Sequence, residues 1–426
     1  MHRVSNYNIV FEYGDSIFVY NTISNKFVEF RNSNTDLLYS KILAIDKSTR
    51  DFEVLVQTGI ITEYNENEER AICDSIYYSK VFDNTLSLTL ITTHNCNFLC
   101  KYCPQEHSKY IMGSEIYCRI KKLILRNISQ FSTLKLILFG GEPTLTYHTY
   151  ASFLDEVNEL CKYYKKNLQG VMITNGYLLN IDMVRKLYKR CITQYQITLD
   201  GSQEIHNRNR CLENGSGTFN VIYRNLQDIL EAKELTRLSI AIRINATKEL
   251  LDDIDNWKLM YDIISEDKRF LINIGVVENR GGDYISNFKG SIINENDEIF
   301  KRAKLALNKH QFYEDSIVKN YFVCKDISKM AYTVDYNGDI RSCSKLYTDN
   351  VIGHLCSNGT IKSEEKKDLF YMKKDSRCFG CSVEPLCHGK RCGLKFICEK
   401  GNIIEIIKTS VIKRINTHNH EILEVR

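Results

Sequence analysis

The strongest constraint on the fold of this chain is a regular alternation of strand-like and helix-like segments between residues 86 and 276. Six short runs rich in Leu, Ile and Val have the length of buried strands: Leu86–Thr93, Leu134–Phe139, Gly170–Thr174, Tyr195–Leu199, Leu238–Ile244 and Phe270–Val276. Five amphipathic stretches lie between them: Ser114–Phe131, Tyr150–Lys165, Ile181–Arg190, Thr218–Lys233 and Leu250–Ile264. This pattern predicts an α/β fold in which right-handed crossovers join parallel strands, with the chemistry at the C-terminal strand ends.

Three cysteines follow the first of these strands. Cys96, Cys100 and Cys103 have the spacing Cys-x3-Cys-x2-Cys. Thiolates are soft ligands that hold iron–sulfur clusters, and three of them leave one iron of a four-iron cluster open to a small molecule. The alternatives are three reduced cysteines or a zinc site with His94 as the fourth ligand, although structural zinc usually binds two Cys-x2-4-Cys knuckles.

This spacing, directly after a strand, resembles the signature of the radical S-adenosylmethionine (SAM) enzymes. The resemblance implies a partial (β/α)6 barrel and a four-iron cluster on these cysteines, whose open iron chelates the methionine end of SAM. One electron then cleaves SAM to a 5′-deoxyadenosyl radical. Tyr102 occupies the aromatic position that lies near adenine in that family.

Polar residues at or near the strand ends are the candidates for binding SAM. In the resembled family, the segment that matches Gly140–Pro143 binds the methionine amine. The cofactor-binding candidates are Tyr102, Gly140, Gly141, Glu142, Pro143, Thr174, Asn175, Thr198, Asp200 and Arg243. For the Thr, Asn and Asp residues a turn or capping role is an equal alternative, and for Arg243 a surface ion pair.

The loop after the fourth strand holds two further features. His206–Arg210 resembles the His-Asp-x-x-Arg segment of the family, but Asn207 stands where Asp is usual, which weakens an acid–base role. Cys211 is a candidate catalytic acid or thiyl donor, because it lies where substrate should enter.

A second group of cysteines lies between residues 320 and 400. The candidate metal ligands there are Cys324, Cys343, Cys378, Cys381, Cys387, Cys392 and Cys398. They resemble the SPASM twin-cluster extension, although four residues rather than three separate the last two clustered cysteines. The resemblance implies two auxiliary clusters, one of them enclosed by Cys378, Cys381, Cys387 and Cys398. The other, on Cys324, Cys343 and Cys392, would be one ligand short, with Cys356 as a spare candidate. Zinc knuckles are the alternative.

Residues 1–80 are predicted to form a separate domain, residues 81–315 the barrel and residues 316–426 the auxiliary domain. Strands at Asn8–Tyr13, Ser16–Tyr20 and Lys26–Phe30 precede helices at Asn34–Ala44 and Thr49–Thr58. This order resembles the winged-helix peptide-recognition element of enzymes that mature ribosomally made peptides, with a structural cap as the alternative. Near the C-terminus, Ile403–Ile415 is predicted to be a strand or helix packed on the barrel.

Composition excludes several classes of protein. An apolar content of 43% and a charged content of 26% indicate a globular chain with ample core. A net charge of +4 with scattered basic residues gives no sign of nucleic-acid binding. There is no apolar run of the ~20 residues that a membrane span needs, and no secretion signal, so we expect a cytoplasmic protein. Because the cytosol keeps thiols reduced, its 16 cysteines indicate metal binding or catalysis rather than disulfides.

Together these features predict a radical SAM peptide maturase that installs a thioether (sactionine-type) or related crosslink in a ribosomally made precursor peptide. The implied cofactors are three 4Fe-4S clusters and SAM. The implied partners are a precursor peptide with a leader and an electron donor such as flavodoxin or ferredoxin. The alternatives are radical epimerisation, carbon–carbon crosslinking, formylglycine synthesis and a zinc-stabilised binding module. Ser344 counts against formylglycine synthesis, because those enzymes keep an acid at that position.

Overall fold

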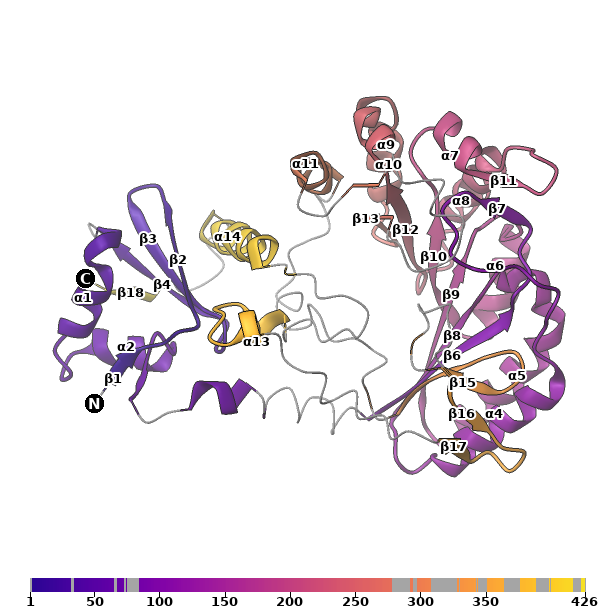
Figure 1. Cartoon of the computed structure of the whole chain (residues 1–426), viewed down its shortest axis with the longest axis horizontal. Helices are drawn as coiled ribbons and strands as arrows, with labels where there is room; N and C mark the ends of the chain where they lie inside the picture. Colours follow the sequence, from indigo (N-terminus) through magenta and orange to yellow (C-terminus); the bar gives the residue numbers. More distant parts are fainter. Residues whose placement is uncertain are drawn as a thin grey trace. The chain divides into compact units, whose positions relative to one another are not determined.

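The computed structural model describes most of the chain, with gaps concentrated beyond residue 277. The described residues are 2–31, 34–64, 67–72, 74, 84–277, 292–293, 297–307, 328, 330–341, 343, 351–363, 376–387, 398, 400–416 and 423–425. They belong to two compact units (Figure 1). The first unit contains residues 1–82, 313–328 and 368–426, and the second contains residues 83–312 and 329–367.

The second unit is built on a ten-stranded sheet with the order β13-β12-β10-β9-β8-β6-β14-β15-β16-β17. Six of its strands correspond to the six predicted ones: β6 (Thr85–Thr93), β8 (Thr133–Gly140), β9 (Asn167–Thr174), β10 (Ile192–Thr198), β12 (Ser239–Ala246) and β13 (Phe270–Val276). Each pairs in parallel with its neighbour in the sheet. The predicted α/β fold with a mostly parallel sheet is therefore confirmed, and the C-terminal ends of these strands lie along one edge.

Helices join the parallel strands. They are α4 (Ser114–Arg126), α5 (Tyr147–Tyr163), α6 (Ile181–Lys189), α8 (Phe219–Glu231), α9 (Lys248–Asp252), α10 (Ile254–Ser265) and, after β13, α11 (Glu298–Leu307). The last helix predicted between strands is divided in two at Asp253, whose ψ of 10° departs from helical geometry. The indole N–H of Trp257 donates to the carbonyl of Leu250 over 3.0 Å and holds the two short helices together.

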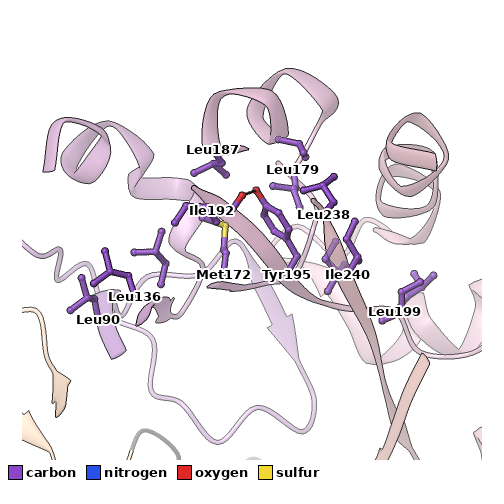
Figure 2. Packing of buried hydrophobic residues seen from close by; sticks show 14 of the residues in the cluster. Leu90, Leu136, Met172, Leu179, Leu187, Ile192, Tyr195, Leu199, Leu238 and Ile240 are labelled. Carbon is purple, nitrogen blue, oxygen red and sulfur yellow. Dashed lines mark hydrogen bonds between the residues drawn. The ribbon is translucent and has the colours of Figure 1, made fainter. Parts of the chain in front are cut away.

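The core of this unit lies between the sheet and these helices. Leu90, Leu136, Met172 and Ile240 come from four strands of the sheet, β6, β8, β9 and β12, and Leu187 of α6 belongs to the same cluster; all are fully buried (Figure 2). In the same cluster, the hydroxyl of Tyr195 donates to the carbonyl of Ile192 over 3.0 Å, which satisfies its polar atom within the core (Figure 2).

Four strands that the sequence did not predict extend this sheet beyond β6. They are β14 (Ala331–Val334), β15 (Asp339–Arg341), β16 (Val351–Leu355) and β17 (Ile361–Ser363). β14 pairs in parallel with β6, and the other three follow as antiparallel neighbours. These strands share the sheet of the barrel, although the predicted division at residue 315 separates them from it.

The first unit contains the predicted N-terminal hairpins. β2 (Asn8–Tyr13), β3 (Ser16–Asn21) and β4 (Lys26–Arg31) pair antiparallel. They precede a 3-10 turn (Thr35–Leu37), α1 (Leu38–Ala44) and α2 (Arg50–Gln57), and β5 (Ile61–Glu63) pairs with an unpredicted first strand, β1 (His2–Val4). The Thr49 hydroxyl accepts a hydrogen bond from the backbone N–H of Phe52 and so caps α2.

The C-terminal part of the chain belongs to this first unit. A 3-10 turn (Ser376–Cys378), α13 (Glu384–Cys387) and α14 (Lys400–Asn416) precede the short strand β18 (Leu423–Val425). In α14, Ile403, Ile407 and Val411 pack with Phe11 and Phe18 of β2 and β3. The prediction that this segment packs on the barrel is therefore wrong, because its apolar stripe covers the N-terminal sheet.

β18 pairs in parallel with the edge of β4, where Leu423 lies opposite Val28 and Val425 opposite Phe30. The sheet of this unit thus has the order β18-β4-β3-β2 (Figure 1). Among the helices that the structure describes, none combines the length and the apolar run that crossing a bilayer requires.

Candidate functional site

The three-cysteine run forms a loop after β6 that is fixed by an unpredicted strand pair. Within it, β7 (Phe98–Cys100) pairs antiparallel with β11 (Arg210–Leu212), and Cys100 lies directly opposite Arg210. The backbone N–H of Lys101 also donates to the carbonyl of Asn209 over 3.0 Å. The cysteine loop is therefore held by the segment that follows β10, more than 100 residues further along the chain.

The end of β8 approaches the same loop closely enough to require glycine. The N–H groups of Gly141 and Glu142 donate to the carbonyls of Thr93 and Asn95 over 2.8 and 2.9 Å. A Cβ atom at Gly140 would lie 2.2 Å from the Thr93 oxygen, and one at Gly141 would lie 2.2 Å from the Asn95 oxygen. Gly140 also has a φ of +136°, which side chains rarely adopt. The two glycines thus set the distance between β8 and the cysteine loop.

The carboxylate of Glu142 joins the ends of β8 and β9. It is fully buried and accepts hydrogen bonds from the hydroxyls of Thr144 and Thr174, over 2.6 and 2.7 Å, and from the N–H groups of Thr144 and Asn175, over 3.0 and 2.6 Å. Burial raises the pKa of Glu142, and these hydrogen bonds oppose the rise. The buried Pro143 starts the 3-10 turn Pro143–Thr146 and accepts from the Tyr150 hydroxyl. Glu142 therefore positions two strand ends.

Asn175 carries this connection on to the cysteine loop. Its side-chain amide donates to Oδ1 of Asn97 over 2.8 Å, and the same nitrogen lies 4.0 Å from Sγ of Cys96. Its own Oδ1 accepts from the backbone N–H of Tyr177. The ends of β8 and β9 and the first cysteine are thus joined in one hydrogen-bonded network.

Tyr102 lies in a second buried network, with residues from the ends of β10 and β12. Its hydroxyl donates to Oδ2 of Asp200 and accepts from Arg210 over 2.9 Å and from the Asn245 amide over 3.1 Å. The other Asp200 oxygen accepts from the backbone N–H of Asn245 over 2.7 Å. Tyr102, Asp200 and Arg210 are all buried. The structure therefore joins two predicted cofactor residues, Tyr102 and Asp200, through one hydroxyl.

The short helix α7 (Gln203–Asn209) connects this network to α8. Nδ1 of the buried His206 accepts from the backbone N–H of Asp200, so its Nε2 carries the proton and donates to the Thr218 hydroxyl over 3.0 Å. Burial lowers the pKa of His206 well below its usual value, and Arg210 lowers it further, so the ring is neutral. Oδ1 of Asn207 accepts from the N–H groups of Thr218 and Phe219 at the start of α8. Asn207 thus holds a helix end, which needs an acceptor but no acid.

The three thiols share one electrostatic environment. Burial raises the pKa of the Cys96 thiol to about 11 and that of Cys100 to about 12, and burial also raises the pKa of Cys103. The positive charge of Arg210 lowers the pKa of all three. Within the part of the chain that the structure describes, no three Cys, His, Asp or Glu side chains form a group that could hold a metal ion.

Two observations nevertheless fit an iron–sulfur cluster on this loop. The donor set consists of three thiols, which are the ligands such clusters take. Beside Cys100, the buried guanidinium of Arg210 has an Nε atom that lacks a hydrogen-bond partner among the described residues. A buried cation with a free donor is compensated by a negatively charged group, and a cluster held by thiolates supplies negative charge.

The remaining predicted residues of the barrel lie close to these networks. Thr198 ends β10 opposite Arg243 of β12. The Arg243 guanidinium donates to Oδ1 of Asn245 over 3.2 Å and to Oδ1 of Asn273 over 3.3 Å, and Gly275 leaves room for it. The cofactor roles of Thr198 and Arg243 stay predictions.

Cys211 pairs with Leu99 in the β7–β11 ladder. Because successive side chains of a strand point to opposite faces, it lies on the face opposite Arg210 and Cys100. Leu99 is 46% exposed, so this face is open to solvent. A catalytic role for Cys211 stays a prediction.

The second cysteine group is divided between the two units. Cys343 follows β15 in the second unit, whereas Cys378, Cys381, Cys387 and Cys398 belong to the first. Cys381 and Cys387 pack beside the core that α14 and β2 share. Cys324 and Cys392, like Ser344, lie outside the described residues. The two auxiliary sites therefore stay predictions.

The spare cysteine, Cys356, lies at the far end of a strand from Cys343. Arg341 pairs with Val351 at the start of β16, and Cys356 follows Leu355 at its end. The five residues of β16 rise by about 3.3 Å each, so Cys356 lies roughly 17 Å along the strand from Val351, whose partner Arg341 is two residues before Cys343. This separation argues against Cys343 and Cys356 as ligands of one cluster.

His94, the possible fourth zinc ligand, is engaged elsewhere. Its Nε2 atom lies 2.7 Å from Oδ1 of Asp335, at the turn between β14 and β15. The sequence also gave no assigned role to Arg210 or Asn245, although both contact Tyr102. Arg210 stands at the arginine position of the His-Asp-x-x-Arg resemblance, which was the one feature of the sequence that could have drawn attention to it. The position of Arg210 opposite Cys100 depends on strand pairing across 110 residues.

Comparison with known proteins supports this reading of the barrel. Residues 90–255 match the model of the Radical SAM superfamily. An Fe-coproporphyrin III synthase of Methanosarcina barkeri is 24% identical over 41% of this chain and 40% of its own length. A cysteine-type anaerobic sulfatase-maturating enzyme of Clostridium novyi is 27% identical over 37% of this chain and 43% of its own length. The chain thus spans less than half the length of these curated relatives.

Among solved structures, anSMEcpe with bound AdoMet and the Cp18Cys peptide has a similar fold. The TM-score is 0.55 at 18% sequence identity, over 79% of this chain and 99% of the other. The matched residues 90–255 contain the cysteine loop, the Gly140–Pro143 turn and the buried network of Tyr102, Asp200 and Arg210. The chain therefore carries a radical SAM domain, the catalytic domain of a superfamily of enzymes that perform radical reactions.

Proposed function

We propose that this protein is a radical SAM peptide maturase that joins a carbon of a ribosomally made precursor peptide to a cysteine sulfur. One observation carries the proposal. The cysteine loop, the Gly140–Glu142 turn, Asn175 and the Tyr102–Asp200 pair meet at the C-terminal edge of one parallel sheet. This is the edge at which α/β folds place their chemistry.

Cys96, Cys100 and Cys103 would hold a 4Fe-4S cluster whose open iron takes SAM. When bound, the cluster and SAM supply a 5′-deoxyadenosyl radical. The protein supplies the fixed geometry around them: Glu142 holds the ends of β8 and β9, and Asn175 ties them to the loop. Tyr102, Thr174, Thr198, Asp200 and Arg243 are the proposed contacts to SAM, with the backbone of Gly140 and Gly141.

The proposed reaction balances as follows. The peptide carbon would give one hydrogen atom to the 5′-deoxyadenosyl radical, which becomes 5′-deoxyadenosine, and the cysteine thiol would lose a proton to water. One electron would leave as the carbon–sulfur bond forms. The electron needs an acceptor, for which we propose auxiliary iron–sulfur clusters on the second cysteine group. A metal-bound thiol is deprotonated outright, so an open iron there would also favour the reacting thiolate.

A peptide substrate is supported by two observations. The structurally similar anSMEcpe has been solved with a bound peptide. In this chain, the N-terminal sheet has β2 at one edge, and its β4 edge is paired only with the three-residue strand β18; an extended peptide can add to such an edge through backbone hydrogen bonds. A leader held there would give the tethered core peptide an effective concentration of order mM. The reactive segment itself then needs only weak binding.

Formylglycine synthesis is the second candidate, because the Clostridium novyi relative is a sulfatase-maturating enzyme. The candidates differ in the mass of the product. A thioether or a carbon–carbon crosslink lacks two hydrogens of the substrate, epimerisation leaves the mass unchanged, and formylglycine synthesis removes the cysteine sulfur.

The test is a reaction of the anaerobically reconstituted protein with SAM, a reductant and a cysteine-containing peptide encoded nearby. Loss of two hydrogens, with the cysteine thiol no longer open to alkylation, would support the thioether. Loss of two hydrogens with a free thiol would indicate a carbon–carbon crosslink. A peptide lacking its leader is the control and should be processed more slowly, whereas equal processing would contradict leader recognition.

A further inference from the structure

Arg210 is a buried cation placed against the cysteine loop. The residue is 5% exposed, and its backbone lies opposite Cys100 in the β7–β11 pair. Residues directly opposite each other in such a pair project to the same face, with Cβ atoms ~5 Å apart. The guanidinium also lies 5.5 Å from the ring centre of Phe98 and 6.0 Å from that of Tyr102. It is therefore directed toward the thiols, behind aromatic rings that keep water out.

The surroundings of Arg210 leave its charge only partly compensated. Its Nη1 atom donates to the neutral Tyr102 hydroxyl over 2.9 Å, and its Nε atom has no partner among the described residues. The carboxylate of Asp200 is connected to Arg210 through that hydroxyl. Asp200 accepts hydrogen bonds on both oxygens, as an ionised carboxylate does. No ion pair of Arg210 with a carboxylate occurs in the described parts of the chain, which is costly for a buried guanidinium.

From this arrangement we infer that Arg210 is the counter-charge of the metal cluster on Cys96, Cys100 and Cys103, and that it sets the reduction potential of that cluster. The inference rests on the proposed function, since it requires a cluster on this loop. A fixed positive charge stabilises the reduced cluster, which carries one more electron, relative to the oxidised one. The negative charge of Asp200, which is linked to Arg210 through Tyr102, acts in the opposite direction and lowers the reduction potential.

The experiment is a redox titration of the reconstituted full-length protein, followed by electron paramagnetic resonance of the reduced cluster without SAM. To remove overlapping signals from other clusters, the reference protein and all variants carry the same substitutions in the second cysteine group. Arg210→Met should make reduction at least tenfold less favourable, a shift of about 59 mV toward negative potential. Arg210→Lys should retain most of the wild-type potential. Asp200→Asn should shift the potential in the positive direction, and it carries the test if Arg210→Met does not fold.

The matched control is Arg208→Met, two residues away. Arg208 is exposed and pairs with Glu249, so its loss should leave the potential unchanged. An unchanged potential in Arg210→Met would overturn the inference. If only Asp200→Asn folds, an unchanged potential in that variant would overturn it. Weaker SAM binding at an unchanged potential would overturn it as well. A wild type that takes up no iron on this loop would instead contradict the proposed function itself, and the inference with it.

Discussion

The Nε2 atom of His94 lies 2.7 Å from Oδ1 of Asp335, and this contact joins the cysteine loop to the hairpin of β14 and β15. Oδ2 of the same carboxylate accepts from Nε of Arg341 over 2.6 Å, and Asp335 is 1% exposed. The ring of Tyr336 lies edge-on to His94, with centroids 5.0 Å apart, and stacks on the ring of Tyr110, with centroids 4.6 Å apart. The hairpin that leads to Cys343 is therefore anchored on the cysteine loop through one buried carboxylate.

Replacing Asp335 by Asn should lower the free energy of unfolding by about 2 kcal/mol, because Arg341 and His94 lose a buried ionic partner. Urea denaturation at neutral pH measures the change. Asp339→Asn is the control, since its partner His354 is 45% exposed and exposed pairs contribute little. Equal destabilisation by the two variants would contradict the anchoring role of Asp335.

The same carboxylate predicts a pH dependence. Burial alone would raise the pKa of Asp335, but His94, the backbone N–H of Tyr336 and Arg341 together bring it below the usual value. A carboxyl group with a lower pKa in the folded state contributes stability above its unfolded pKa of about 3.9, and this stability is lost as the pH falls further. Below about pH 4 the wild type should therefore lose stability more steeply than Asp335→Asn. Parallel curves for the two proteins would refute this sign.

Gly141→Ala should displace the cysteine loop, because the new methyl group would lie 2.2 Å from the backbone oxygen of Asn95. We expect a loss of about 1–3 kcal/mol in stability, as for other overpacked sites, together with reduced iron uptake. Gly401→Ala is the control, since there is open space around that position in α14. Full iron uptake by Gly141→Ala would show that the close approach of β8 does not hold the loop.

Cys343→Ser and Cys356→Ser should differ in their iron content. Because β16 separates the two cysteines, Cys356 should not complete a cluster that Cys343 holds. We expect Cys343→Ser to lose iron after reconstitution and Cys356→Ser to retain the full wild-type amount. Equal losses in the two variants would mean that both cysteines are ligands despite their separation.

Truncation after Asn416 should strengthen leader binding, because β18 pairs with the β4 edge of the N-terminal sheet. A leader that adds to this edge must compete with a strand of the same chain, which acts at a high effective concentration. Titration calorimetry with the leader alone should give a several-fold lower Kd for the truncated protein. An unchanged Kd would place the leader elsewhere, and a higher Kd would make β18 part of its binding site.

The barrel strands were predictable because each buried run carries its own apolar signal. β13 begins and ends where the sequence places it, at Phe270–Val276, and the other strands differ by a few residues at their ends. The three cysteines and the Gly140–Pro143 turn were predictable for a related reason. Residue type and order along the chain are visible in a sequence, and the parallel fold brings the strand ends together.

Contacts that depend on distant pairing were not predictable. Nothing local to Arg210 shows that it lies opposite Cys100, and nothing local to β14 shows that it pairs with β6. The apolar stripe of α14 predicts an amphipathic segment but not the surface that it covers. The prediction that it covers the barrel is wrong, because it packs on the N-terminal sheet. For Glu142 the residue type indicated a hydrogen-bond acceptor, whereas its four protein donors became visible only in the folded chain.

The most direct test of the account measures iron and acid-labile sulfide, with electron paramagnetic resonance, on anaerobically reconstituted protein. Wild type is compared with the Cys96→Ala/Cys100→Ala/Cys103→Ala variant. Three 4Fe-4S clusters require about twelve irons in the wild type, of which the variant should lose about four. Zinc without sulfide, or an iron content that the variant leaves unchanged, would contradict a radical SAM cluster on this loop.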